Sequence, residues 1–139
     1  MKDLDWSSLT FGYLPTDYNV RCYYRDGHWG EIEVCSDEYI KMHVAATCLH
    51  YGQEAFEGLK AFRCPDGKVR IFRMDANAER LQNTSRGIMM PEVPTELFEE
   101  MCTKVVRLNQ EWIPPYESGA ALYLRPLLVG ITADVGVKP

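Results

Sequence analysis

The sequence predicts an α+β domain in which helices pack on an antiparallel sheet. Two stretches rich in β-forming residues are each broken by a turn signal, two helical segments follow as a block, and an almost continuously apolar stretch comes near the end. Strands joined as hairpins beside a separate group of helices favour this class over a doubly wound parallel sheet. The 139 residues bound the chain at one domain of ordinary size.

The first hairpin is expected near the N-terminus. Residues 18–24 are rich in β-formers and stop at Asp26-Gly27, a pair typical of tight turns. Residues 29–34 then alternate between apolar and polar types, as a strand with one covered face does. We therefore expect this segment to pair back on the first one.

The second hairpin has the stronger turn signal. Residues 58–64 and 68–73 carry alternating apolar side chains, and Pro65-Asp66-Gly67 lies between them. Proline presets its backbone angle, aspartate bonds to the chain two residues on, and glycine accepts a positive φ. The three together predict an antiparallel pair with a tight connection.

Two helices are expected next. Asp75 is placed to cap a helix over 76–86, with Ala78, Leu81 and Ser85 on one face. The second helix is expected over 95–111, after Pro94. Its apolar residues recur at spacings of three and four: Leu97, Met101, Val105, Leu108 and Trp112.

The last predicted element is a buried strand within 120–131, which is apolar throughout except for Arg125. A charge inside such a strand is costly unless it is paired or solvated, so Arg125 is a candidate functional residue. A guanidinium beside the hydroxyl of Tyr123 suits capture of a carboxylate.

Composition excludes several classes of partner. The net charge is −5, which argues against nucleic acid and anionic membranes, because both select clustered cations. No window approaches the roughly 18 apolar residues of a membrane span. Five widely spaced cysteines without a C-x-x-C pair fit free thiols in a reducing cytoplasm, and three scattered histidines suggest no metal site.

Common catalytic motifs are missing, and two further features are ambiguous on their residues alone. The segment 49–58 frames aromatic and acidic residues between glycines, which is also what a loop entering a strand looks like. Arg80 lies on a helix after a hairpin, where an arginine is most often solvated but can also bind a phosphate.

Taken together, four segments resemble the N-terminal part of branched-chain amino-acid aminotransferases: Leu49–Phe62 with Arg73, Asn77–Arg80, Leu122–Pro126, and Gly136–Pro139. These are pyridoxal-phosphate enzymes of fold type IV. The resemblance runs from about Phe11 to Pro139. It implies that residues 1–139 form the small domain of that fold, cytoplasmic and homodimeric, acting on amino acids and 2-oxo acids in branched-chain amino-acid biosynthesis.

The resemblance also implies roles for individual residues. Arg80 corresponds to the arginine that holds the cofactor phosphate. The remaining positions match substrate-binding residues, some of them donated across the dimer: Phe11, Tyr51, Phe56, Tyr123, Arg125, Val135 and Val137. Arg125 with Tyr123 would let one pocket take the methyl groups of leucine, isoleucine and valine in one half-reaction and the γ-carboxylate of glutamate in the other.

No residue of the chain matches the lysine that binds the cofactor as a Schiff base. In the resembled family that lysine lies in a second, larger domain, so residues 1–139 imply a truncated small domain that is inactive alone. Two alternatives stay open: a stand-alone module that binds ligand without catalysis, and another fold-type IV enzyme, a D-amino-acid aminotransferase or an aminodeoxychorismate lyase. The ending Gly136–Pro139 and the segment around Arg125 argue against the second.

Overall fold

A computed structural model describes residues 1–136. Short strands and three helices follow one another along the chain, with two 3₁₀ turns at 110–112 and 116–118. The elements are β1 (Asn19–Arg21), β2 (Tyr24–Arg25), β3 (His28–Trp29), β4 (Glu33–Cys35), α1 (Thr47–Tyr51), β5 (Glu54–Phe56), β6 (Leu59–Arg63), β7 (Val69–Ile71), α2 (Met74–Gly87), α3 (Thr95–Leu108), β8 (Leu122–Leu124) and β9 (Leu127–Val129). The predicted α+β class is confirmed.

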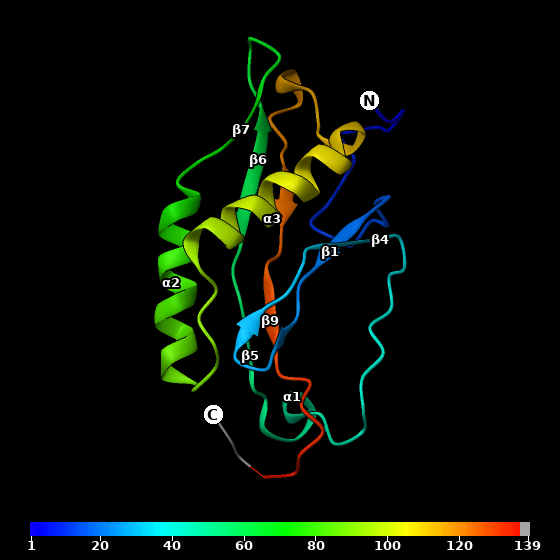
Figure 1. Ribbon diagram of the computed structural model, residues 1–139. Helices are drawn as coiled ribbons and strands as arrows, with labels where there is room; N and C mark the ends of the chain where they lie inside the picture. The colour runs from blue at the N-terminus through cyan, green and yellow to red at the C-terminus, as the bar shows by residue number, and fades with distance from the viewer. Residues whose placement is uncertain (137–139) are drawn as a thin grey trace.

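The centre of the fold is one long antiparallel pairing that is interrupted once. β5 pairs with β9 so that Phe56 faces Leu127, and β6 pairs with β8 so that Leu59 faces Leu124. Both pairings have the same register, so the two short sheets continue each other along the long axis of the molecule (Figure 1). β7 adds the predicted hairpin partner to β6 through Pro65-Asp66-Gly67.

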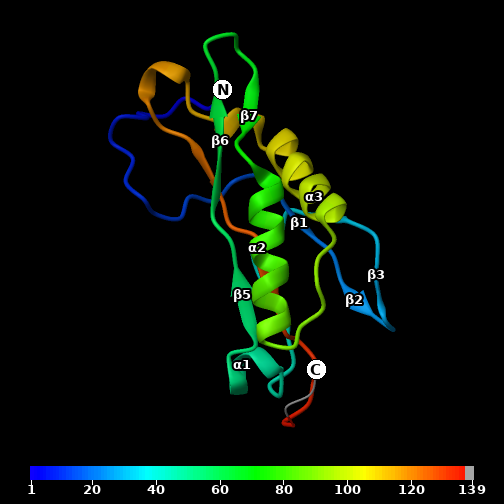
Figure 2. The same ribbon diagram turned by 90° about the vertical axis from the view of Figure 1, so that its left-hand side faces the viewer.

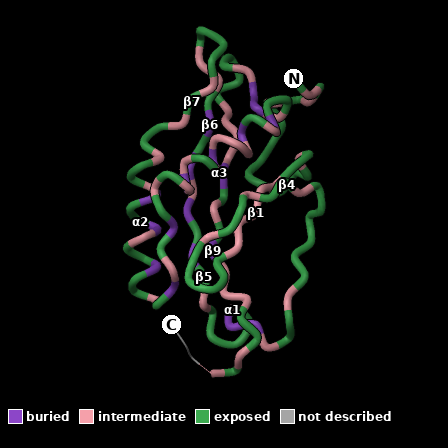
Figure 3. The backbone as a smooth tube through the Cα atoms, viewed as in Figure 1, coloured by how far each residue is buried: buried purple, intermediate pink, exposed green. Residues whose placement is uncertain are grey.

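Helices α2 and α3 cover one face of these strands (Figures 1 and 2). Side chains alternate along a strand, and here the odd-numbered residues from Ala55 to Ala61 point toward the helices and are buried. The buried residues gather between the strands and the helices in Figure 3. The core comprises Ala55, Leu59, Ala61, Ala78, Leu81, Met90, Val93, Phe98, Cys102, Val106, Ile113, Leu124 and Leu128. The opposite face, which we call the open face, carries exposed Phe56, Phe62 and Leu127.

The predicted first hairpin forms, but in two pieces. Arg21 faces Glu33 in the β1–β4 pair, whereas Tyr24 faces Trp29 in the β2–β3 pair, so one extra residue lies on the returning strand. This extra residue is a bulge, and the β2–β3 end extends to one side of the molecule (Figure 2).

Buried Asn109 ties the N-terminal segment to the end of α3. Its Oδ1 accepts hydrogen bonds from the backbone N–H groups of Asp17 and Tyr18, at 3.1 and 3.0 Å. Its Nδ2 donates to the carbonyls of Tyr18 and Val105, at 3.0 and 2.8 Å. An amide has two donors and an acceptor oxygen, so all its polar atoms are satisfied in this position.

Four details of the predicted helices are wrong. α2 begins at Met74, because Arg73 adopts a left-handed conformation with φ 51°, and Asp75 bonds to the Arg73 side chain rather than capping the helix. α3 ends at Leu108, three residues early, and a 3₁₀ turn follows. Its most buried residues are Phe98, Cys102 and Val106, one position along from the predicted stripe.

The last predicted strand is also divided. Residues 120–131 form β8 and β9, with Arg125-Pro126 between them, because proline has no N–H to give to the pairing. The stretch is not fully buried, since Leu127 lies on the open face. No helix within residues 1–136 has both the length and the apolar character needed to cross a membrane.

Candidate functional site

Four of the predicted site residues come together on the open face: Phe11, Phe56, Tyr123 and Arg125, which we call the open-face cluster. The Cζ of Arg125 lies 4.2 Å from the ring centre of Phe56 and 5.3 Å from that of Tyr123. Its Nε donates to the Tyr123 hydroxyl at 3.3 Å. Phe11 meets the Tyr123 ring edge to face, with 5.0 Å between ring centres. One guanidinium is therefore held among aromatic rings.

The register of the strands brings these side chains together. Phe56 on β5 faces Leu127 on β9, and Lys60 on β6 faces Tyr123 on β8. The same register extends across the gap between the two strand pairs and places Gly58 opposite Arg125. The Tyr123 ring lies over Gly58, where a Cβ atom would be 3.0 Å from the ring carbon Cζ. Glycine at residue 58 therefore leaves the space that the tyrosine ring occupies.

The open-face cluster combines apolar surface with an available positive charge. Phe11 and Phe56 are 81% and 60% exposed, so both rings can be covered by another molecule or chain segment. No ion pair joins Arg125 to a carboxylate within residues 1–136. Its two Nη groups can bind a carboxylate end-on, and the rings beside it can contact methyl groups.

Arg80 lies apart from this cluster, on the helix side of the strands. Its Nε and Nη2 donate to the carboxylate of Glu57, at 2.8 and 2.6 Å. Asn77 Nδ2 donates to the same carboxylate at 3.0 Å. Burial raises the pKa of Glu57, but the hydrogen bonds from Arg80 and Asn77 lower it by more, so this pKa lies below its usual range. The pair is charged at neutral pH.

Tyr51 and Val135 form a third group at the end of the molecule where α1 lies. The Tyr51 hydroxyl donates to the Val135 carbonyl. Residues 130–134 run beside 45–48, with backbone bonds that include Cys48 N–H to the Gly130 carbonyl, at 3.0 Å. Val137 lies outside the described residues. No hydrogen bond, ion pair or ring contact between side chains joins the three groups within residues 1–136.

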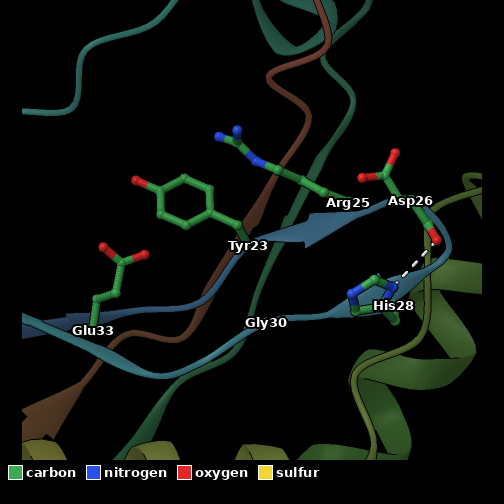
Figure 4. Close-up of a pocket in the computed structure, with 6 residues that line it drawn as sticks. All are labelled: Tyr23, Arg25, Asp26, His28, Gly30 and Glu33. Carbon is green, nitrogen blue, oxygen red and sulfur yellow. Dashed lines mark hydrogen bonds between the residues drawn. The ribbon is translucent and has the colours of Figure 1, made fainter.

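A hollow of about 490 Å³ lies elsewhere, along the bulged first hairpin (Figure 4). Its lining includes Tyr23 and Arg25, whose guanidinium stacks 4.9 Å from the Tyr23 ring centre. None of the predicted site residues lines it. Within residues 1–136, no three His, Cys, Asp or Glu side chains are placed to hold a metal ion.

The site residues predicted from the sequence do not include Glu57, although a signal for it was present. Ala55, Leu59 and Ala61 alternate along one strand face, and Glu57 falls on the same face. A charged residue at a position that alternation assigns to the core needs a buried partner. A cation on the covering helix is the expected partner, and Arg80 lies there.

No protein-family model matches the chain, but curated relatives do. The branched-chain-amino-acid aminotransferase of Haemophilus influenzae is 52% identical over 138 residues, which are 99% of this chain and 40% of that protein. The enzyme of the same name from Helicobacter pylori is 43% identical over 139 residues, or 41% of its length. The chain thus spans about two fifths of these curated relatives.

Solved structures give the same result. The branched-chain amino acid aminotransferase of Escherichia coli matches 89% of this chain and 35% of its own, with a TM-score of 0.67 and 26% identity. The T.th. enzyme complexed with N-(5'-phosphopyridoxyl)-L-glutamate matches 76% of this chain and 33% of its own, with a TM-score of 0.59 and 29% identity. The chain therefore belongs to the branched-chain-amino-acid aminotransferase family and corresponds to the N-terminal portion of its members.

Proposed function

We propose that this chain supplies the substrate-side wall and one cofactor contact of an enzyme that transfers the amino group of leucine, isoleucine or valine to 2-oxoglutarate. The observation that carries the proposal is the open-face cluster, in which Arg125 lies 4.2 Å from the ring centre of Phe56 and bonds to Tyr123. A cation among apolar rings lets one pocket bind either an apolar side chain or a carboxylate.

Each half-reaction uses a different part of the cluster. The rings of Phe56, Tyr123 and Phe11 contact the branched side chain and exclude water from it. Arg125 and the Tyr123 hydroxyl bind the γ-carboxylate of glutamate or 2-oxoglutarate, in a charge-assisted pair that the low-dielectric rings strengthen. When leucine is bound, Arg125 has no carboxylate partner. Its guanidinium then keeps its contacts with the aromatic rings and stays solvated.

The residues present fit pyridoxal phosphate, and the T.th. relative is complexed with a phosphopyridoxyl form of glutamate. When bound, this cofactor would take the amino group from one substrate and give it to the other. Arg80 would hold the phosphate: its side chain is 68% exposed, and its Nη1 donates to no atom within residues 1–136. The lysine that binds the cofactor would lie in a second domain, outside residues 1–139.

The remaining predicted residues would act at a neighbouring subunit of a homodimer. Tyr51 and Val135 are joined to each other but not to the open-face cluster, and both are exposed. Together with Val137 they would complete the partner's substrate pocket. The exposed open face would be covered by the second domain, which is why its aromatic side chains are not buried here.

We also place the enzyme in the cytoplasm, with neither nucleic acid nor membrane as a partner. The acidic balance of the chain supports the statement about partners. The five cysteines, all free thiols, support the cytoplasmic location.

A chimaera tests the proposed function. This chain would replace the matching N-terminal residues of the Haemophilus influenzae relative, and leucine-to-2-oxoglutarate transfer would be measured with added pyridoxal phosphate. We expect activity within about tenfold of the unmodified relative, which corresponds to a change of at most about 1.4 kcal/mol in the activation free energy. A folded chimaera without transfer, beside an active relative, would contradict the proposal.

Arg125→Met in the active chimaera tests the dual use of the cluster. We expect kcat/KM for glutamate and 2-oxoglutarate to fall roughly 100-fold, and that for leucine to change less than about threefold. Arg70→Met is the matched control, because Arg70 lies on the β7 hairpin and pairs with Asp66 there. Equal losses for both substrates would show that Arg125 does not select the carboxylate.

A further inference from the structure

Glu57 is the one carboxylate that is buried within residues 1–136, with 3% of its surface exposed. It occupies a core position of the strands, on the same face as Ala55 and Leu59. A charge at such a position carries a desolvation cost, and apolar replacements of buried ion pairs are often neutral or stabilising. Packing alone therefore does not account for a carboxylate at residue 57.

The two members of the pair differ sharply in exposure. Glu57 is buried, whereas the Arg80 side chain is 68% exposed and could be solvated without any partner. Both carboxylate oxygens are nevertheless used: Oε1 accepts from Arg80 Nε, and Oε2 accepts from Arg80 Nη2 and from Asn77 Nδ2. The Glu57 backbone is fixed as well, since its N–H donates to the Pro126 carbonyl at 2.9 Å.

This geometry fixes the orientation of the guanidinium. A side-on pair through Nε and Nη2 sets the plane and rotation of the group, and it leaves Nη1 with both of its hydrogens pointing away from Glu57. A free arginine loses rotamer entropy when a ligand orders it, and the ligand has to offset that loss on binding. With Glu57 in place, much of that cost is met during folding.

We propose that Glu57 is a positioning residue, which holds the Arg80 guanidinium so that its Nη1 edge receives the phosphate of the cofactor. The inference rests on the proposed function, because it assigns Glu57 a task only where Arg80 binds phosphate. Glu57 does not touch the phosphate itself. Its effect is on affinity for a phosphorylated ligand, not on the chemistry of the amino group.

The test compares two probes, pyridoxal phosphate and pyridoxal, on the apo form of the chimaera by absorbance titration. Because pyridoxal has no phosphate, only a residue acting through the phosphate affects the two probes differently. Glu57→Gln should raise the Kd for pyridoxal phosphate roughly tenfold and leave that for pyridoxal within about twofold, on the scale of one charge-assisted bond. Glu79→Gln, an exposed neighbour on α2, is the matched control.

Three further results distinguish the role of Glu57 from that of Arg80. If Arg80→Lys weakens pyridoxal phosphate binding and Glu57→Gln does not, Arg80 keeps its role and the positioning role of Glu57 is overturned. If neither variant changes the preference for pyridoxal phosphate, the phosphate role of Arg80 fails as well. Should Glu57→Gln not fold, Asn77→Ala removes one bond to the same carboxylate, and it should weaken pyridoxal phosphate binding selectively; an unchanged preference there also overturns the proposal.

Discussion

Tyr123 lies across Gly58 on the open face of the strands, so closely that a Cβ atom at residue 58 would overlap the phenol oxygen and lie 3.0 Å from the ring carbon Cζ. This relationship sets the position of the tyrosine ring, which meets Phe11 edge to face, and the Tyr123 hydroxyl accepts a hydrogen bond from Arg125 Nε. A residue without a side chain thereby shapes the open-face cluster.

Gly58→Ala should displace the Tyr123 ring at a modest cost in stability. The overlapping atoms belong to the outer end of a side chain that can rotate away, so we expect a loss of about 1 kcal/mol in the free energy of unfolding. The ring contact with Phe11 should disappear, which aromatic NOE measurements detect. Gly87→Ala is the control, because nothing lies within 4 Å of a Cβ atom there. An intact Phe11–Tyr123 NOE in Gly58→Ala would contradict the geometry.

Gly130→Ala should be more damaging than Gly58→Ala. A Cβ atom at residue 130 would overlap Thr47 Oγ1 and lie 2.8 Å from Gln53 Oε1 and 3.0 Å from the Gln53 backbone carbonyl. The backbone cannot rotate away as a phenol ring can, so we expect a loss of about 2–3 kcal/mol. Urea unfolding of the two variants under the same conditions checks the order, and equal losses would refute it.

The ion pair of Glu57 and Arg80 makes a pH-dependent contribution to stability. The pKa of Glu57 is lowered in the folded chain, while the unfolded value is the ordinary 4.5. Between these two values the unfolded chain binds more protons, so stability rises with pH there. The contribution is complete above about pH 4.5 and is lost as the pH falls through the folded pKa.

Glu57→Gln removes this titration. The stability difference between wild type and Glu57→Gln should therefore be about 1–3 kcal/mol near pH 6 and shrink as the pH falls below 4.5 through the folded pKa. Urea unfolding at a series of pH values measures it, with exposed Glu79→Gln as the reference variant. A difference that stays constant over this range would mean that the ion pair does not form.

Cys102 should be the least reactive of the five thiols. It is 4% exposed on the core side of α3, and burial, with a smaller effect from Glu99, raises its pKa to about 12. Because only the thiolate reacts, alkylation near pH 8 should be at least about tenfold slower than at half-buried Cys64. Iodoacetamide labelling with peptide mass mapping gives the rates. Equal alkylation rates at Cys102 and Cys64 in the folded chain would show that Cys102 does not lie in the core.

Local signals account for the parts of the fold that were predicted correctly. The turn Pro65-Asp66-Gly67 joins β6 to β7 as expected, because its chemistry acts within a few residues. The face of α2 with Ala78, Leu81 and Ser85 is buried as expected. For α3 two apolar stripes lie one position apart, and only the packing against the strands decides that Phe98, and not Leu97, is the more buried.

Long-range pairing accounts for what was missed. Arg125 stands out in the sequence, but its contact with Phe56 depends on the register between strands about 70 residues apart, which no local pattern fixes. The bond of Glu57 to Arg80 depends in the same way on how α2 lies over the strands. The division of the last strand at Pro126 could have been read from the proline alone.

We propose above all that this chain provides binding groups for a transamination whose covalent lysine lies elsewhere. The most direct test is leucine-to-2-oxoglutarate transfer by the chain alone with pyridoxal phosphate, followed by borohydride reduction and intact mass measurement. We predict no turnover and no stoichiometric pyridoxyl adduct on any of its six lysines. Turnover together with one adduct on a single lysine would show that the chain carries its own catalytic lysine, and would overturn the proposed function.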